Sequence, residues 1–247
     1  MNVKRFRNKL YICSDWYHYE AFKLKVYLKS VNFVTKYVKV GVVRYQKLNL
    51  MSRGEFIIST SKYNVRDLES IFNDLFNKIE QTELKSGGEE PMYLPSSGPN
   101  TLAQIISTHD YFSSVLHEVS HWCIAGSERR KLVDFGYWYE PDGRNEIKQR
   151  EFELVEVKPQ AIEWLFTEAC GIKFRLSVDN LEQTTNEQEF KGASDWFKQA
   201  VLDQALHYLE LENVPERALV FIEALLAHFR PRVRKLEKTA FSMAVLD

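Results

Sequence analysis

Two histidines spaced four residues apart are the part of the sequence best suited to chemistry. They belong to the segment His117-Glu118-Val119-Ser120-His121, inside a predicted helix from Asp110 to Ala125. Residues four apart share one face of a helix, so both imidazoles can bind the same metal ion. Glu118 lies one position further round, where it can contact a metal-bound water. The spacing predicts a metal centre with His117 and His121 as ligands and Glu118 as the candidate catalytic residue, the alternative being a surface or core histidine pair without a metal.

A reactive metal centre needs a third protein ligand and open coordination positions. The Gly-x-x-His extension that supplies a third histidine in one protease class is absent, because Ile124 and Ser127 occupy those positions. We therefore expect a carboxylate. The next predicted helix, over residues 150–169, carries three candidates: Glu153, Glu156 and Glu163.

Glu156 is the preferred third ligand and Glu153 the second choice. Glu156 stands among three apolar residues, where an unpaired charge would be costly. These neighbours are Leu154, Val155 and Val157. For each glutamate the alternative is a solvated helix face without any metal.

Hydrophobic periodicity predicts further helices, with few strands between them. We expect helices over residues 65–84, 194–211 and 215–229, a loop over 85–100, a short strand or turn over 101–106, and an aromatic strand or loop over 132–142. Ser107 and Thr108 are the candidate caps of the histidine helix, and Ser194 or Asp195 caps a later one. The predicted fold class is α+β: a mostly helical single domain around the His-Glu-x-x-His helix, packed on a second helix with a metal ligand. It lacks the many short strands of a jelly-roll oxygenase.

The near-neutral net charge of −1 conceals an asymmetry. Residues 1–50 hold eleven Lys and Arg against Asp15 and Glu20, a balance of +9, so residues 51–247 carry −10. We therefore predict a basic segment, 1–50, joined to a catalytic domain, 51–247. The segment is an extension upstream of a natural start at Met51, an arm that binds nucleic acid or the ribosome, or a β-rich subdomain with alternating strands over 22–43.

Cysteine usage and hydropathy indicate where such a protein works. The three cysteines share no short spacing, and an odd number cannot form a closed set of disulfides, which favours a reducing compartment. No run approaches the roughly 18 apolar residues of a membrane-spanning helix. We expect a soluble, cytoplasmic protein without a membrane partner.

Three ordered motifs resemble the bacterial elongation factor P hydroxylases, over about residues 60–230. The motifs are His117-Glu118-Val119-Ser120-His121-Trp122-Cys123-Ile124-Ala125-Gly126, then Leu132-Val133-Asp134-Phe135-Gly136-Tyr137-Trp138-Tyr139 with Pro141-Asp142-Gly143-Arg144, and Val155-Glu156-Val157-Lys158-Pro159-Gln160-Ala161. Shorter segments that also resemble the family are Tyr93-Leu94-Pro95, Asp179-Asn180-Leu181-Glu182 and Pro215-Glu216-Arg217. Nothing in residues 1–50 matches, which favours the extension.

The resemblance implies an enzyme that hydroxylates the β-lysylated lysine of elongation factor P with a non-haem metal. It places His117 and His121 at the histidine positions and Glu156 at the carboxylate position. Fe²⁺ suits this reaction, because two histidines and a carboxylate leave positions for oxygen and substrate, and the alternative, Zn²⁺, has no redox chemistry. Oxygen is the expected co-substrate. The reductant stays open, since no oxoglutarate or flavin site is recognised.

The substrate and two competing functions complete the expectations. An acidic domain suits a lysine-bearing protein substrate, and no nucleic-acid partner is expected for it. Candidate substrate-binding residues are Asp134, Tyr137, Tyr139 and Asp142, the alternative being ordinary core aromatics and a turn aspartate. The competing functions are a zinc metallopeptidase, with Glu118 as general base, and a non-catalytic metal-stabilised binding module.

Overall fold

A computed structural model describes residues 3–6, 9–12, 63–137, 144–178, 193–210 and 213–246. The chain divides into two compact units, Met1–Thr60 and Ser61–Asp247. In the first unit, β1 (Val3–Phe6) pairs with β2 (Lys9–Ile12) as an antiparallel hairpin. The strands expected over 22–43 lie outside the described residues.

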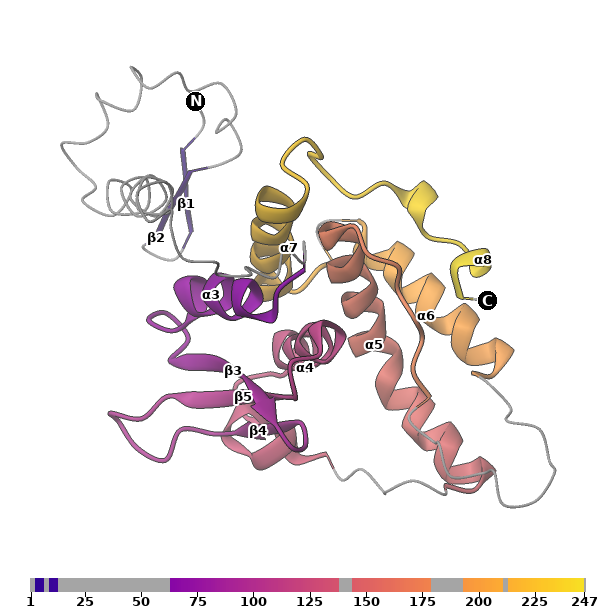
Figure 1. Ribbon diagram of the computed structural model, residues 1–247, viewed down its shortest axis with the longest axis horizontal. Coiled ribbons are helices and arrows are strands. Elements are labelled where there is room, and N and C mark those ends of the chain that lie inside the picture. The colour runs from indigo at the N-terminus through magenta and orange to yellow at the C-terminus, as the bar shows by residue number, and fades with distance from the viewer. Residues whose placement is uncertain are drawn as a thin grey trace, which may run out of the picture. The chain divides into compact units, whose positions relative to one another are not determined.

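The second unit combines a small sheet with a group of helices, which confirms the predicted α+β class (Figure 1). Its sheet has the order β3-β5-β4, in which β5 runs parallel to β3 and antiparallel to β4. The strands are β3 (Thr82–Gly88), β4 (Met92–Leu94) and β5 (Ala103–Thr108). The helices are α3 (Val65–Phe76), α4 (Phe112–Ile124), α5 (Glu146–Cys170), α6 (Asp195–Tyr208), α7 (Glu216–Phe229) and α8 (Met243–Leu246).

Helix α4 lies between the sheet and helices α5 and α7. It packs against β5 on one side and against α5 and α7 on the other (Figure 1). The core behind it is aromatic: the fully buried Phe72 ring lies 4.9 Å from the Phe76 and Trp122 rings and 6.1 Å from that of Phe221. Burial on both sides fixes the axis of α4, the helix that carries both histidines.

The prediction of one helix over 65–84 and a loop over 85–100 is wrong in part. Helix α3 ends at Phe76, and Ile79, which continues its apolar spacing, is 61% exposed. The Asn73 side chain accepts a hydrogen bond from Leu84 N–H (2.8 Å) and donates one to Leu84 C=O (3.1 Å). Leu84 is therefore buried as part of a strand, because its backbone pairs with β5 and with a helix side chain. Much of the expected loop likewise forms β3 and β4.

The predicted start of the histidine helix is also wrong in detail. Tyr111 is the N-terminal cap of α4, and its side chain makes no capping hydrogen bond. Ser107 is buried in β5, and the Thr108 N–H donates to the Ser114 hydroxyl (3.0 Å). At α6 the prediction holds, since Ser194 accepts a hydrogen bond from Phe197 N–H.

Helix α5 is longer than predicted and passes through Pro159 without a break. It begins after Asn145, whose side chain accepts from Lys148 N–H, and ends at Gly171, which has the left-handed φ of 74° that favours glycine. Before Pro159 the helix alternates between buried and exposed residues, whereas residues 159–167 are all buried. The second half anchors α5 against α6 and α7 and so holds the first half beside α4.

The described part of segment 132–142, residues 132–137, does not form the strand that was one of the two predicted forms. Residues 129–131 and 133–136 form two 3₁₀ turns, η2 and η3, and residues 138–143 lie outside the described part of the chain.

Among the described helices, none combines the length and apolar character that a membrane crossing would demand.

Candidate metal centre

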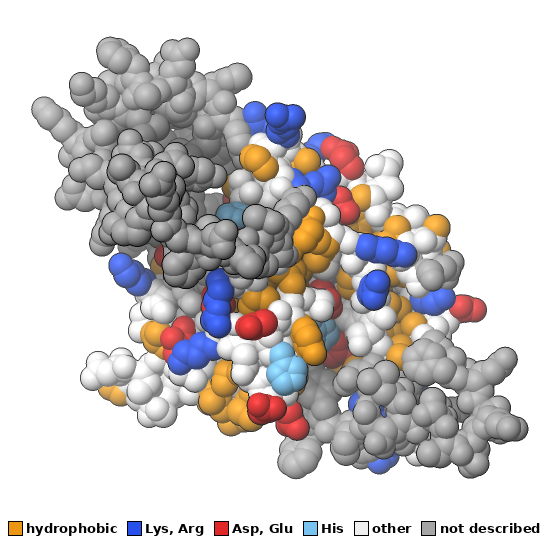
Figure 2. Space-filling view, in the orientation of Figure 1, with side chains coloured by type: hydrophobic (Ala, Val, Ile, Leu, Met, Phe, Trp, Pro, Cys, Tyr) orange, Lys and Arg blue, Asp and Glu red, His pale blue; other side chains and the backbone are white. Residues whose placement is uncertain are grey.

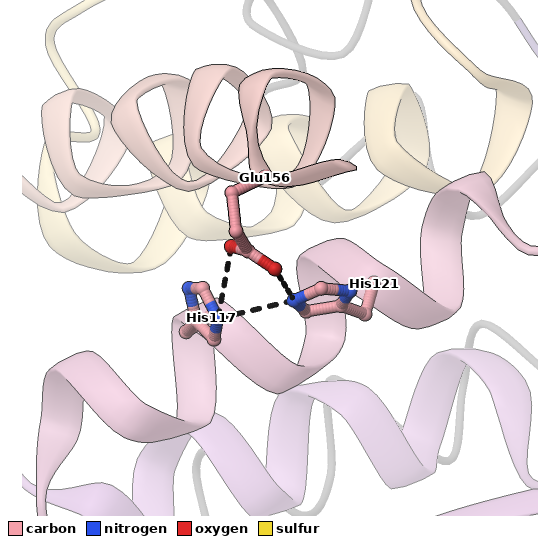
Figure 3. Close-up of side chains that lie close together, drawn as sticks. All are labelled: His117, His121 and Glu156. Atoms are coloured by element: carbon pink, nitrogen blue, oxygen red, sulfur yellow. Dashed lines mark hydrogen bonds and ion pairs between the residues drawn. The ribbon is translucent and has the colours of Figure 1, made fainter. Parts of the chain in front are cut away.

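The side chains of His117, His121 and Glu156 converge between α4 and α5 (Figure 3). His121 Nε2 lies 3.3 Å from Glu156 Oε1, and His117 Nε2 lies 3.6 Å from Glu156 Oε2. The two Nε2 atoms are 3.1 Å apart. One potential ligand atom from each residue falls within 4.8 Å of the other two.

The donor set fits a transition metal. Two imidazole nitrogens that face each other at 3.1 Å cannot both hold a proton there; one shared proton or one metal ion can satisfy the pair. Two histidines and a carboxylate are ligands that suit Fe²⁺ and Zn²⁺. Within the described ranges, no other group of three His, Cys, Asp or Glu residues meets the same distance criterion.

Burial differs between the two histidines. The His121 side chain is 6% exposed and that of Glu156 is 1% exposed, whereas 26% of the His117 side chain is accessible. The apolar flank of α4 explains the first two values, because Val115, Leu116 and Val119 are fully buried. Of the three residues, His117 is therefore the one in contact with solvent.

Glu163 binds the other ring nitrogen of His117, Nδ1. Its Oε2 lies 2.8 Å from His117 Nδ1, and the side chain is buried. A carboxylate at this distance accepts a hydrogen bond from Nδ1–H and so directs Nε2 toward Glu156 and His121. Glu163, one of the three candidate ligands, thus orients a histidine in place of joining the convergent group.

The charges of this cluster shift the pKa values of its members in opposite directions. Burial alone would lower the pKa of His117, but the hydrogen bond and charge of Glu163, with the charges of Glu156 and Glu118, raise it to about 10. Burial would raise the pKa of Glu156, but the charge and hydrogen bond of His121 lower it to about 2. Without a metal, a proton on His117 neutralises part of the buried negative charge; a cation in its place would do the same.

Glu118 and Glu153, the other two acidic candidates, are not members of the convergent group. Burial raises the pKa of the half-buried Glu118, and Asp134 is among the carboxylates that add to this effect. Glu153 accepts a hydrogen bond from the Ser194 hydroxyl (2.8 Å) and lies 3.6 Å from Arg150 Nη1. The second-choice ligand is therefore engaged at the start of α6.

Beyond α4 the chain forms a tight turn over residues 129–137, which we call the 129–137 hook. Asp134, Phe135 and Gly136 have successive φ values of 47°, 58° and 70°. The left-handed region is unfavourable for the first two by about 1–2 kcal/mol each. In addition, a Cβ at Gly136 would lie 2.7 Å from Leu132 Cδ1. The surrounding contacts must hold this strained backbone in place.

Tyr93 on β4 supplies most of those contacts. Its N–H donates to Asp134 Oδ1 (2.7 Å), its hydroxyl donates to the backbone of Arg130 (2.9 Å), and its ring stacks on Phe135 at 4.1 Å. Phe135 is buried, as the alternative of ordinary core aromatics expected. One carboxylate oxygen of Asp134 accepts the hydrogen bond from Tyr93 N–H. The contact of Asp134 with substrate stays a prediction.

The hook brings Tyr137 to the side of α4 that carries His121. The Tyr137 ring centroid lies 6.4 Å from that of His121, and the Arg129 guanidinium stacks 3.6 Å from the Tyr137 centroid while it donates to its hydroxyl (2.5 Å). Tyr137 thus forms a wall beside the histidines. Tyr139 and Asp142, the other two candidate substrate-binding residues, lie outside the described residues.

Gln160 is a site residue that the sequence interpretation missed. Its amide lies 3.4 Å from Glu156 Oε2, donates to Ser177 C=O (2.8 Å) and accepts from Ser177 N–H (3.0 Å). Its position four residues after Glu156, in a run of apolar residues, was the available signal, because a buried amide requires partners.

Comparison with known proteins identifies the family. The family model described as elongation factor P hydroxylase matches residues 71–241, which include the whole convergent group. A curated relative, the elongation factor P lysine hydroxylase of Haemophilus influenzae, is 45% identical over 168 residues, covering 68% of this chain and 90% of the relative. Residues 1–50 lie outside the family match. The chain belongs to the elongation factor P hydroxylase family.

Proposed function

We propose that this protein hydroxylates the modified, β-lysylated lysine of elongation factor P at a non-haem metal centre held by His117, His121 and Glu156. The family supports the hydroxylation of elongation factor P. The observation that carries the metal assignment is the convergence of two imidazole nitrogens and a carboxylate oxygen within 4.8 Å. We infer a cytoplasmic enzyme of the oxidoreductase class, because its substrate acts in translation.

The overall reaction inserts one oxygen atom into a C–H bond. Dioxygen, two electrons from a reductant and two protons give the alcohol and water. Fe²⁺ would supply the oxygen activation that no side chain can perform, whereas Zn²⁺ lacks redox chemistry. Three protein ligands on one side of an ion leave the other positions for oxygen and substrate.

The chain's own residues orient the reactants and handle protons. Glu163 fixes the His117 ring so that Nε2 faces Glu156. Glu118, whose pKa is raised by burial, is placed to give up or take a proton beside the ligands. Tyr137 offers an aromatic wall to the aliphatic arm of the lysine. Asp134 is our candidate for the contact with its ammonium group.

The net charge alone does not define where elongation factor P docks. On the face shown in Figure 2, acidic and basic side chains are interspersed, with hydrophobic surface between them. Attraction of a basic partner to the charge of −10 would thus be spread over the surface. Neither the family match nor the curated relative favours the metallopeptidase alternative.

The test uses elongation factor P co-expressed with its lysylating enzymes and with this protein. We expect intact-mass analysis to show a gain of about 16 Da, one oxygen atom, with wild type and with Glu153→Ala, and no gain with Glu156→Ala. Metal analysis of protein prepared without oxygen should show iron, and reduced occupancy in Glu156→Ala. No mass gain with wild type, together with zinc alone, would overturn the proposal. Equal occupancy in wild type and Glu156→Ala would remove Glu156 from the ligand set.

A further inference from the structure

The C-terminal end of α4 leaves several backbone carbonyls without helical partners. The helix ends at Ile124, and Ala125 turns to an extended conformation with φ −64° and ψ 121°. Its N–H still donates to His121 C=O (3.0 Å), the last bond of the helix. The carbonyls that follow need other donors because they are buried.

Arg217, at the start of α7, donates to those carbonyls. Its Nη2 lies 2.8 Å from Trp122 O, 3.1 Å from Cys123 O and 2.6 Å from Ala125 O. A cation at the C-terminal end of a helix also interacts favourably with the helix dipole. One guanidinium thus closes the last turn of the helix that carries both histidines.

Arg217 is itself held from several sides. Its guanidinium lies 4.5 Å from the centroid of the fully buried Trp122, and its Nη1 lies 3.9 Å from Glu80, which also pairs with Arg130 at 2.9 Å. The Arg217 side chain is 15% exposed. These contacts place the guanidinium between α7, the α3–β3 connection and the end of α4.

The same turn determines the position of His121. His121 directly precedes Trp122, and its Nε2 must stay near Glu156 Oε1, now at 3.3 Å. His117, one turn earlier, is oriented through its ring by Glu163. The turn that bears His121 is instead closed through the backbone, by Arg217. A frayed last turn would move His121 relative to Glu156, because no intrahelical bond follows the one from Ala125.

We propose that Arg217 is a positioning residue of the metal centre, which holds His121 in place by capping the carbonyls that follow it. The inference rests on the proposed metal site at His117, His121 and Glu156. It assigns to Arg217 a role beyond general stability: the affinity and coordination geometry of the metal depend on a residue that touches none of the ligand side chains.

The test compares Co²⁺ binding by metal-free wild type, Arg217→Met, Arg217→Lys and Arg230→Met. Arg230 is the matched control, because its Nη1 donates to Glu168 C=O near the end of α5, on a different helix. Visible absorption reports both the dissociation constant and the coordination geometry of Co²⁺. Thermal melting of each metal-free protein reports stability separately.

We expect Arg217→Met to weaken Co²⁺ binding by about 10- to 100-fold, as outer partners of metal ligands do, and to change the Co²⁺ spectrum. Arg217→Lys keeps the charge with fewer donors, so its affinity should lie between those of Arg217→Met and wild type. Arg230→Met should bind like wild type even if its melting temperature falls.

Wild-type affinity and spectrum in folded Arg217→Met would overturn the role of Arg217 while leaving the metal site intact. If that variant does not fold, Arg217→Lys decides: weakened binding supports the role, and wild-type binding overturns it. Absence of Co²⁺ binding by wild type would instead refute the metal site in the proposed function.

Discussion

Replacing Glu163 by Gln tests how far a residue behind a ligand controls the proposed metal centre. The substitution keeps the size of the side chain and removes the charge that faces His117 Nδ1 at 2.8 Å. The neutral amide is a weaker acceptor for the hydrogen bond from Nδ1–H. The His117 ring is therefore held less firmly, and Nε2 becomes less basic. Loss of such a partner typically weakens metal affinity by about 10- to 100-fold, which corresponds to about 1.4–2.7 kcal/mol.

The assay is a competition titration of Fe²⁺ or Co²⁺ against a chelator of known affinity. Glu151→Gln is the matched control, since Glu151 is an exposed glutamate of the same helix and should bind metal like wild type. Circular dichroism checks that both variants are folded. Equal affinities for Glu163→Gln and Glu151→Gln would refute the argument that Glu163 orients His117.

Three further outcomes test the core, the hook and the charge state of the site. Phe72→Ala should lower the free energy of unfolding by about 3–5 kcal/mol, against less than about 0.5 kcal/mol for exposed Ile79→Ala; denaturant titrations compare them. Gly136→Ala should cost about 1–2 kcal/mol because of its positive φ, whereas Gly126→Ala, with no atom within 4 Å of the added Cβ, should be tolerated in the same assay. Because the pKa of His117 is raised to about 10 in the metal-free protein, metal binding at pH 7.5 should release about one proton from His117, and fewer protons as the pH approaches 10. Calorimetry in buffers of different ionisation enthalpy measures the number of protons released. A release of zero protons at pH 7.5 would contradict this prediction.

The histidine pair was predictable because its geometry is local. A spacing of four places two side chains on one helix face whatever the rest of the chain does. Glu156 was selected on a premise that the structure contradicts: its neighbours Leu154 and Val155 are 55% and 39% exposed. Glu156 is buried because its own face of α5 meets α4, a property of helical phase that its neighbours in sequence do not share.

The features that the sequence interpretation missed depend on contacts between distant residues. The apolar spacing after Phe76 continues the helical pattern, but Asn73 and β5 pair with the backbone around Leu84 and make it a strand. The 129–137 hook depends on two non-glycine residues with positive φ, which propensity disfavours and Tyr93 stabilises. Arg217 lies 92 to 95 residues from the carbonyls it caps.

Pro159 gives the three donors of the convergent group unequal freedom. A proline has no N–H, so the turn of α5 that begins at Val155 and contains Glu156 lacks one backbone hydrogen bond. Both histidines, by contrast, project from a helix closed at its end and enclosed by the core. If the site holds a metal, we expect adjustment to ions of different radius to involve the Glu156 carboxylate rather than α4. Selectivity among metals of similar chemistry would then rest on supply and redox properties more than on the size of the site.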